Sequence, residues 1–218
     1  MMAVKKASFE IFPGKTVALV GESGSGKSVI SQTIMGLLPS QAKIYGGSIL
    51  FSPNSEEKPT IDIAALNPSG KLIRDIRGSQ ISIIFQEPMT SLSPLHTIGN
   101  QILEALMLHR RLHTDEATGV VIEMLRLVGF PDPKRGFKTY PFELSGGLRQ
   151  RSMIAMALIC RPCLLIADEP TTALDVTIQA QILKLMKDLQ AEFQMALLMI
   201  THDLGVVANM ADDVVVMY

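Results

Sequence analysis

Cysteine is scarce in this chain: two of its 218 residues are cysteines, Cys160 and Cys163. A disulfide framework would need more of them, so we expect a fold held by its own core, in a reducing compartment. The two thiols have Cys-x-x-Cys spacing, but a structural zinc site needs four ligands and the chain has no further cysteine. We therefore interpret both as packing groups.

Long hydrophobic runs are also missing, although 47% of the residues are hydrophobic and the mean hydropathy is +0.28. A membrane-spanning helix needs about 20 consecutive apolar residues. The longest candidate, at 153–167, is too short and contains Arg161 and Pro162. We expect the apolar excess to form a buried parallel sheet, whose strands are continuous apolar runs. Some of it could also mark a surface for an apolar partner.

The chain has no excess charge of either sign, since its formal net charge is -1. Proteins that bind nucleic acid through its phosphates usually present a basic surface, so we expect no nucleic-acid partner. Residues 1–15 lack the apolar core of a secretory signal, and no repeats occur. The length suits one domain with an inserted lobe.

Short apolar runs alternate with helical patterns, which indicates an α/β fold with a mostly parallel sheet covered by helices. Strands are predicted at 8–12, 16–21, 46–51, 81–85, 163–168, 196–201 and 213–218. Helices are predicted at 27–38, 97–112 and 114–129. The sequence thus predicts a single domain, 1–218, in which a core formed by 1–86 and 163–218 is interrupted by a helical lobe at 87–162.

The segment "GESGSGKS" at 21–28 fits the phosphate-binding pattern G-x-x-x-x-G-K-[ST]. It follows a predicted strand and opens a predicted helix, the context that separates this pattern from an accidental glycine-rich turn. Backbone N–H groups of such a loop turn towards phosphate oxygens, and the helix N-terminus adds positive potential. We expect Lys27 to contact the β- and γ-phosphates and Ser28 to bind Mg²⁺. The predicted nucleotide-binding residues are Gly21, Glu22, Ser23, Gly24, Ser25, Gly26, Lys27 and Ser28.

Polar side chains follow three other predicted strands, at the sheet edge where open α/β folds bind ligands. Asp168 can hold Mg²⁺, and Glu169 can polarise an attacking water as general base. Gln86 can offer a carbonyl oxygen to Mg²⁺ or to water. His202 can bind the γ-phosphate or orient the water. Each alone could be a solvated or structural residue, but together with the phosphate loop they predict a hydrolytic nucleotide site.

A second anion-binding pattern appears in "LSGGLRQR" at 144–151, before a predicted helix. The Ser145 hydroxyl, the amides of Gly146 and Gly147 and the helix start can form an anion nest. Ser145 can equally serve as the N-cap of that helix. The two interpretations are compatible.

These motifs together resemble the ATP-binding domain of ABC transporters, and the resemblance covers essentially the whole chain. The matching motifs, in order, are "GESGSGKS", Gln86, "LSGG", "LLIADEP" at 164–170, "ALD" at 173–175 and "ITHD" at 200–203. The "LSGG" motif is specific, because other P-loop ATPases lack it. The resemblance implies a P-loop NTPase (RecA-like) core with an antiparallel β part and an inserted helical subdomain.

The resemblance also implies that two ATPase domains pair head to tail. Each ATP is then clamped between the phosphate loop of one chain and the signature of the other. Ser145, Gly146, Gly147 and Asp175 would accordingly serve a nucleotide held by a second ABC ATPase subunit, in a homodimer or a heterodimer.

Segments 85–102, 149–158 and 168–183 are similar to the bacterial dipeptide, oligopeptide and nickel importer ATPases. This implies ATP hydrolysis with ATP and Mg²⁺, at the cytoplasmic side of the inner membrane. Transmembrane permease subunits would be partners, with 86–94 as the expected contact, and a solute-binding protein would act indirectly. A soluble ABC ATPase not linked to transport and a nucleotide-binding module with little turnover are the alternatives.

Two departures from the family pattern affect these expectations. Leu148 stands where the signature commonly has Gln, which bears on the fine geometry around the nucleotide. The chain also begins too close to Gly21 to contain the upstream aromatic that stacks on adenine in the family, and it stops within a predicted strand. We therefore expect a truncated chain with weakened ATP affinity, since base stacking contributes about 1–3 kcal/mol in nucleic-acid systems.

Overall fold

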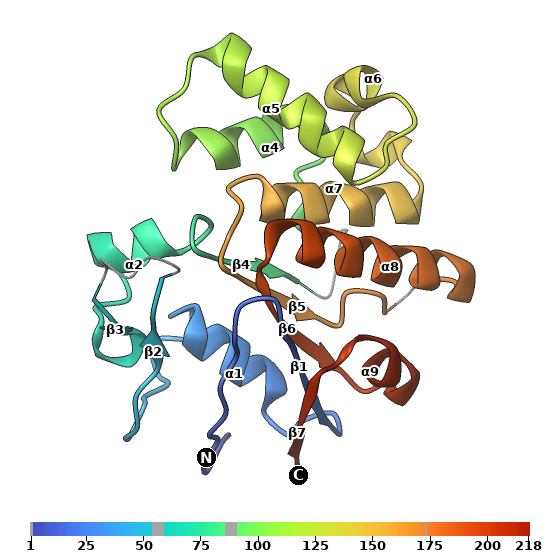
Figure 1. Ribbon diagram of the computed structural model, residues 1–218. Coiled ribbons are helices and arrows are strands. Elements are labelled where there is room, and N and C mark those ends of the chain that lie inside the picture. Colours follow the sequence, from blue (N-terminus) through green and yellow to red (C-terminus); the bar gives the residue numbers. More distant parts are fainter. Residues whose placement is uncertain (1, 54–58, 86–90, 173) are drawn as a thin grey trace.

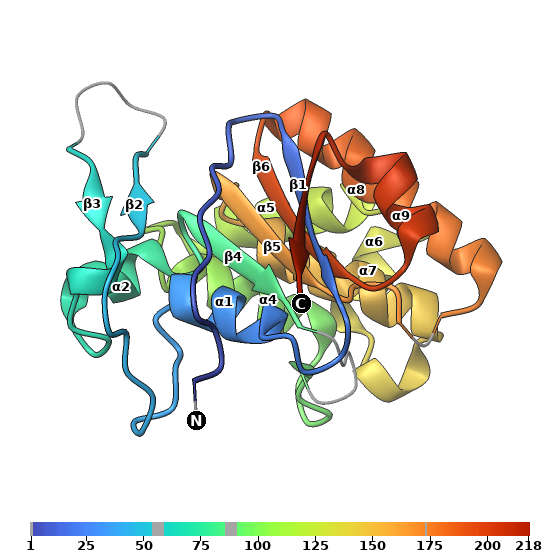
Figure 2. The same ribbon diagram turned by 90° about the horizontal axis from the view of Figure 1, so that it is seen from below.

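The computed structural model describes residues 2–53, 59–85, 91–172 and 174–218. Its centre is a five-stranded sheet in the order β4-β5-β6-β1-β7, and every neighbouring pair is parallel (Figures 1 and 2). The strands of this sheet are β1 (Thr16–Gly21), β4 (Ile81–Ile84), β5 (Leu164–Asp168), β6 (Ala196–Thr201) and β7 (Asp213–Met217). A separate antiparallel pair joins β2 (Leu50–Phe51) to β3 (Ile61–Asp62). The predicted fold class, a mostly parallel sheet with an antiparallel part, is confirmed.

The strand predicted at 8–12 is wrong, because the structure places no strand there. Phe9 and Ile11, the alternating apolar residues that suggested it, do pack against the core. Alternation shows which side chains of an extended segment are buried, but it does not provide the hydrogen-bonded neighbour that a strand also needs. The strand predicted at 46–51 likewise shortens to the two residues of β2.

Helices cover both faces of the large sheet. They are α1 (Lys27–Ile34), α2 (Lys71–Ile76), α4 (Ile98–Met107), α5 (Thr114–Leu127), α6 (Pro133–Lys138), α7 (Gly146–Leu158), α8 (Val176–Phe193) and α9 (Leu204–Met210), with 3₁₀ turns at Ile63–Ala65 and Pro141–Glu143. Figure 1 shows α7 and α8 on one face, α1 on the other, and α4, α5 and α6 stacked beyond α7. Within the described residues, none of these helices is long and apolar enough to cross a membrane.

The two largest hydrophobic clusters hold these layers together, one on each face of the sheet. In β5, Leu165 and Ala167 belong to the cluster with α7 and α8, whereas Ile166 belongs to the cluster with α1. This is the alternation of a strand buried on both faces, and each fully buried large aliphatic side chain contributes about 1.5–3 kcal/mol. Helices α4 to α7 extend the first cluster, where the sequence predicts the inserted lobe. The division into 1–86, 87–162 and 163–218 stays a prediction.

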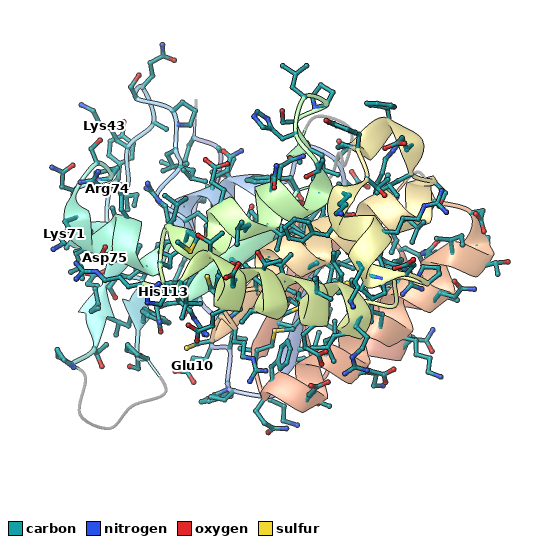
Figure 3. All side chains as sticks on the ribbon, turned by 90° about the horizontal axis from the view of Figure 1, so that it is seen from above. Glu10, Lys43, Lys71, Arg74, Asp75 and His113 are labelled. Carbon is teal, nitrogen blue, oxygen red and sulfur yellow. The ribbon has the colours of Figure 1, made fainter. Side chains whose placement is uncertain are left out.

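Helix α2 shows the opposite pattern, because only one of its sides is covered. Ile73 and Ile76 are buried, whereas Lys71, Arg74 and Asp75 are exposed. Figure 3 shows these three charged side chains gathered at the outer end of the molecule. The charges of α2 therefore lie in solvent and stabilise the fold little.

The register of the large sheet aligns the carboxyl ends of its inner strands. Asp168, the last residue of β5, lies opposite Ile200 of β6, and Thr201 lies opposite Val20 of β1. Segments far apart in sequence therefore leave the sheet side by side, which fixes where the predicted site must form.

We predict that Gly99→Ala destabilises the packing of α4 on α6. A β-carbon at Gly99 would lie 2.2 Å from Cγ of the Phe137 ring, so either the ring or the helix must move. Overpacking of this kind lowers the free energy of unfolding by about 1–3 kcal/mol, which urea unfolding measures.

Gly119→Ala on α5 is the matched control. A β-carbon there meets nothing within 4 Å, so we expect it to raise the free energy of unfolding by up to about 1 kcal/mol through helix propensity alone. Equal stabilities of the two variants would contradict the packing argument.

Candidate functional site

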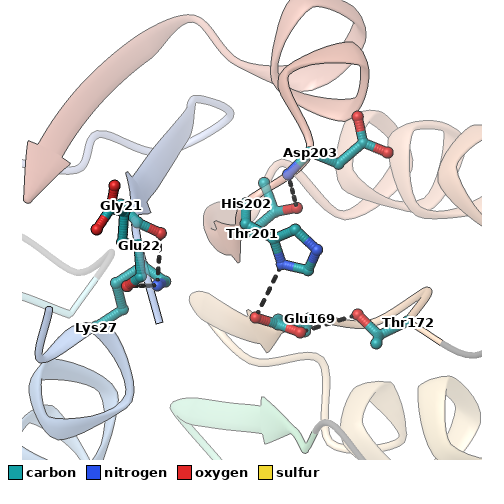
Figure 4. A network of polar contacts seen from close by, with 8 residues as sticks. All are labelled: Gly21, Glu22, Lys27, Glu169, Thr172, Thr201, His202 and Asp203. Carbon is teal, nitrogen blue, oxygen red and sulfur yellow. Dashed lines mark hydrogen bonds and ion pairs between the residues drawn. The ribbon is translucent and has the colours of Figure 1, made fainter. Parts of the chain in front are cut away.

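The loop between β1 and α1 is folded around the ammonium group of Lys27. This side chain is 7% exposed, and its Nζ donates to the carbonyl oxygens of Gly21 and Glu22, both at 2.8 Å (Figure 4). Gly26 ends the loop as the N-cap of α1 with φ 95°, a conformation that favours glycine. The predicted strand-loop-helix context is present, and a phosphate that binds here competes with two carbonyls for the lysine charge.

The rest of the loop offers further groups to an anion. Glu22, Ser23 and Gly24 are exposed, and Ser25 and Gly26 are half-buried. The Ser25 hydroxyl oxygen is buried and has no hydrogen-bond partner within the described part of the chain. Such an orphaned polar atom costs free energy unless something binds it, and a phosphate oxygen fits that requirement.

Ser28, in the first turn of α1, and Asp168, the last residue of β5, lie close together at the edge of the sheet. Asp168 is 8% exposed, and its burial raises the pKa of the carboxyl group, an effect opposed mainly by a hydrogen bond from Ser28. The negative charge of Glu169 also raises this pKa, whereas the positive charge of Lys27 and a hydrogen bond from Ser31 lower it. A carboxylate and a hydroxyl close enough to affect each other are hard oxygen donors that suit Mg²⁺. This ion takes one or two protein ligands and fills its other positions with phosphate and water.

Glu169 follows Asp168 but points to different partners. Its backbone turns out of the strand with φ 49°, a strained value for a residue other than glycine. Its N–H donates to the carbonyl of Ile200 at 2.9 Å, which ties the turn to β6. Nδ1 of His202 lies 3.2 Å from Glu169 Oε1, the distance of an imidazole N–H donating to a carboxylate (Figure 4). The structure thus brings together the two residues that sequence analysis assigns to the attacking water.

Sequence reasoning did not find Thr172. Its hydroxyl donates to the other oxygen of the Glu169 carboxylate, Oε2, at 3.0 Å. The signal in the sequence that could have found it is a residue with a hydroxyl group three positions after Glu169. Such a residue reaches back only if the chain turns immediately, and the strained φ of Glu169 provides that turn.

The "LSGG" segment forms the start of α7, on the opposite face of the sheet from α1 (Figure 1). Ser145 is exposed and caps this helix, accepting a hydrogen bond from the N–H of Leu148 at 3.4 Å. Asp175 caps α8 in the same way, accepting from the N–H of Ile178 at 3.0 Å. A β-carbon on Gly147 would lie 3.0 Å from Ile178, so the two helix starts share one corner. The N-cap interpretation of Ser145 is confirmed, and its nucleotide role stays a prediction.

Two other predictions concern residues near these motifs. Gln86 lies outside the described residues, as do residues 87–90 of the 86–94 segment. Cys160 is buried, and this burial raises the pKa of its thiol, as expected for a packing group.

Comparisons with known proteins place these features in a family. The family model described as "ABC transporter" matches residues 4–172. The dipeptide transport ATP-binding protein DppD of Bacillus subtilis is 54% identical over 219 residues, which cover 100% of this chain and 63% of that protein. The oligopeptide transport ATP-binding protein AmiE of Streptococcus pneumoniae is 50% identical, covering 100% of this chain and 59% of that protein. The chain therefore spans less than two thirds of the length of these relatives.

Solved structures agree with the sequence relatives. The ATP-binding cassette MJ0796, in a dimeric post-hydrolysis state bound to ADP and Pi, superposes with a TM-score of 0.81 at 28% identity. That match covers 99% of this chain and 86% of the cassette. The structure of cbiO1 from Clostridium perfringens, part of the transporter complex cbiONQ, gives a TM-score of 0.77 at 28% identity, covering 99% of this chain and 78% of that one. With its phosphate loop, its paired acids and its "LSGG" helix start, the chain belongs to the ABC transporter family.

Proposed function

We propose that this chain is the ATP-binding and ATP-hydrolysing part of a bacterial ABC importer for short peptides. The observation that carries the proposal is the contact of Glu169 with His202 at the same sheet edge as Lys27 and Asp168. The relatives are named for dipeptide and oligopeptide transport, which supports peptides rather than nickel as cargo.

Each group has a distinct part in the proposed hydrolysis. Lys27 and the loop amides bind the β- and γ-phosphates, and the Ser25 hydroxyl adds a donor. Ser28 and Asp168 would hold Mg²⁺, which offsets negative charge on the phosphates as it develops. Glu169 accepts a proton from the attacking water, and His202 holds the glutamate and contacts the γ-phosphate. The contact between Glu169 and His202 favours turnover over a purely binding role.

The partners follow from the position of the signature. Ser145 and the corner formed by α7 and α8 would complete the site of a second ABC ATPase subunit, an arrangement supported by the dimeric state of MJ0796. Permease subunits would bind this pair at the cytoplasmic side of the inner membrane, with 86–94 in the contact, and a solute-binding protein would deliver the cargo. The transport names of the relatives favour this over a soluble ABC ATPase not linked to transport.

We predict that Glu169→Gln and Lys27→Ala separate hydrolysis from binding. Removing a general base slows the chemical step by about 100-fold or more, so Glu169→Gln should lose phosphate release but keep its ATP dissociation constant. Removing a charged donor should weaken ATP binding by about tenfold or more. Phosphate-release assays and titration with a fluorescent ATP analogue measure the two effects. Robust hydrolysis by Glu169→Gln would refute the assignment of the base.

We predict that two inactive variants restore activity when mixed. Ser145→Arg blocks the signature and Lys27→Ala disables the phosphate loop, so each homodimer has no intact site. A mixed dimer has one site built from the two undamaged halves, which should return up to about a quarter of wild-type phosphate release, given random pairing of two-fold symmetric dimers. A mixture that stays inactive, while both variants still form dimers, would contradict a site shared between chains.

A further inference from the structure

The polar network around Glu169 contains a contact that the proposed reaction does not require (Figure 4). The Thr172 hydroxyl donates to Glu169 Oε2 at 3.0 Å, and His202 Nδ1 lies 3.2 Å from Oε1. Thr172 belongs to the turn after β5, whereas His202 follows β6. The two oxygens of one carboxylate are thus held from two different loops.

We propose that Thr172 is a positioning residue for hydrolysis. Its hydroxyl fixes the rotation of the Glu169 carboxylate, so that a lone pair of that group faces the attacking water. This inference rests on the proposed function of Glu169 as general base, and it adds a specific role for a residue outside the motifs.

A second hydrogen bond to the Glu169 carboxylate is needed because of where the first, from His202, comes from. The His202 side chain is 63% exposed, whereas that of Glu169 is 16% exposed. A hydrogen bond from an exposed side chain to one oxygen restrains the rotation of a carboxylate only in part. A second bond from another loop, to the other oxygen, restrains that rotation further. General bases need such precision, because a misplacement of about 1 Å at a reacting group can cost 100-fold in rate.

Thr172 is itself well anchored for this task. Its backbone N–H donates to the carbonyl of Glu169 at 3.3 Å, closing the turn that begins at the strained φ of 49°. The backbone N–H and the side-chain hydroxyl of Thr172 therefore both donate hydrogen bonds to Glu169. Its side chain is exposed, in contrast to the neighbouring Thr171, which is 7% exposed. Loss of the Thr172 hydroxyl should accordingly affect the position of the carboxylate and leave the core intact.

The test compares three variants of the full chain, Thr172→Val, Thr172→Ser and Thr118→Val. Thr172→Val keeps the shape of the side chain but removes the donor, and we expect kcat for ATP hydrolysis to fall about tenfold, the effect of losing a hydrogen bond to a charged group. The KM and the dissociation constant for Mg-ATP should not change, because the phosphates are bound elsewhere. Thr172→Ser keeps the hydroxyl and should restore kcat to within about twofold of wild type.

Thr118→Val is the matched control. Thr118 on α5 donates its hydroxyl to the carbonyl of Thr114 at 2.8 Å, so this variant loses a similar hydrogen bond away from the site. We expect it to hydrolyse ATP like wild type, and thermal unfolding compares the stability of all three variants.

The outcomes separate this inference from the function on which it rests. An unchanged or raised kcat in Thr172→Val, a fall that Thr172→Ser shares, or a parallel loss of Mg-ATP affinity would overturn the positioning role while leaving the ATPase assignment intact. A wild-type chain that binds Mg-ATP but releases no phosphate would overturn the proposed function, and the role of Thr172 with it.

Discussion

Parallel pairing of β1, β5 and β6 is the constraint on which the rest of the molecule depends. The three strands run in one direction and in a register that sets Asp168 opposite Ile200 and Thr201 opposite Val20. The segments that follow them are brought to one edge, although more than a hundred residues separate Gly21 from Asp168 along the chain. The helices on both faces are needed for this, because a parallel sheet is stable only when both faces are covered.

The phosphate loop is folded around a buried positive charge, the ammonium group of Lys27. An ammonium group that leaves water loses hydration, and two carbonyl oxygens at 2.8 Å replace only part of it. A negatively charged phosphate is a stronger partner for the same group than a carbonyl dipole. The loop therefore carries a charge whose best partner is an anion, and the orphaned Ser25 hydroxyl nearby points to the same conclusion.

The sequence predicted most of the strands that carry the site, because each is an apolar run followed by a polar residue that leaves the sheet. It predicted Asp168, Glu169 and His202 at one sheet edge for the same reason, and Ser28 from the pattern of the phosphate loop. It was wrong about 8–12, where the alternation of Phe9 and Ile11 reflects one-sided burial without a pairing partner. The role of Thr172 could not be predicted, since it depends on a backbone angle at Glu169 that no residue pattern specifies.

That angle also explains how two adjacent acids come to face different partners. In a continuing strand, Asp168 and Glu169 would point to opposite faces of the sheet. Because β5 ends at Asp168 and Glu169 adopts φ 49°, the first carboxylate stays buried beside Ser28 and the second reaches His202 and Thr172. A left-handed residue costs about 1–2 kcal/mol, which the hydrogen bond from Glu169 to Ile200 helps to offset. The strained turn is therefore the structural reason that Asp168 and Glu169, the acids that we propose bind Mg²⁺ and accept a proton, can both lie at one site while they face different partners.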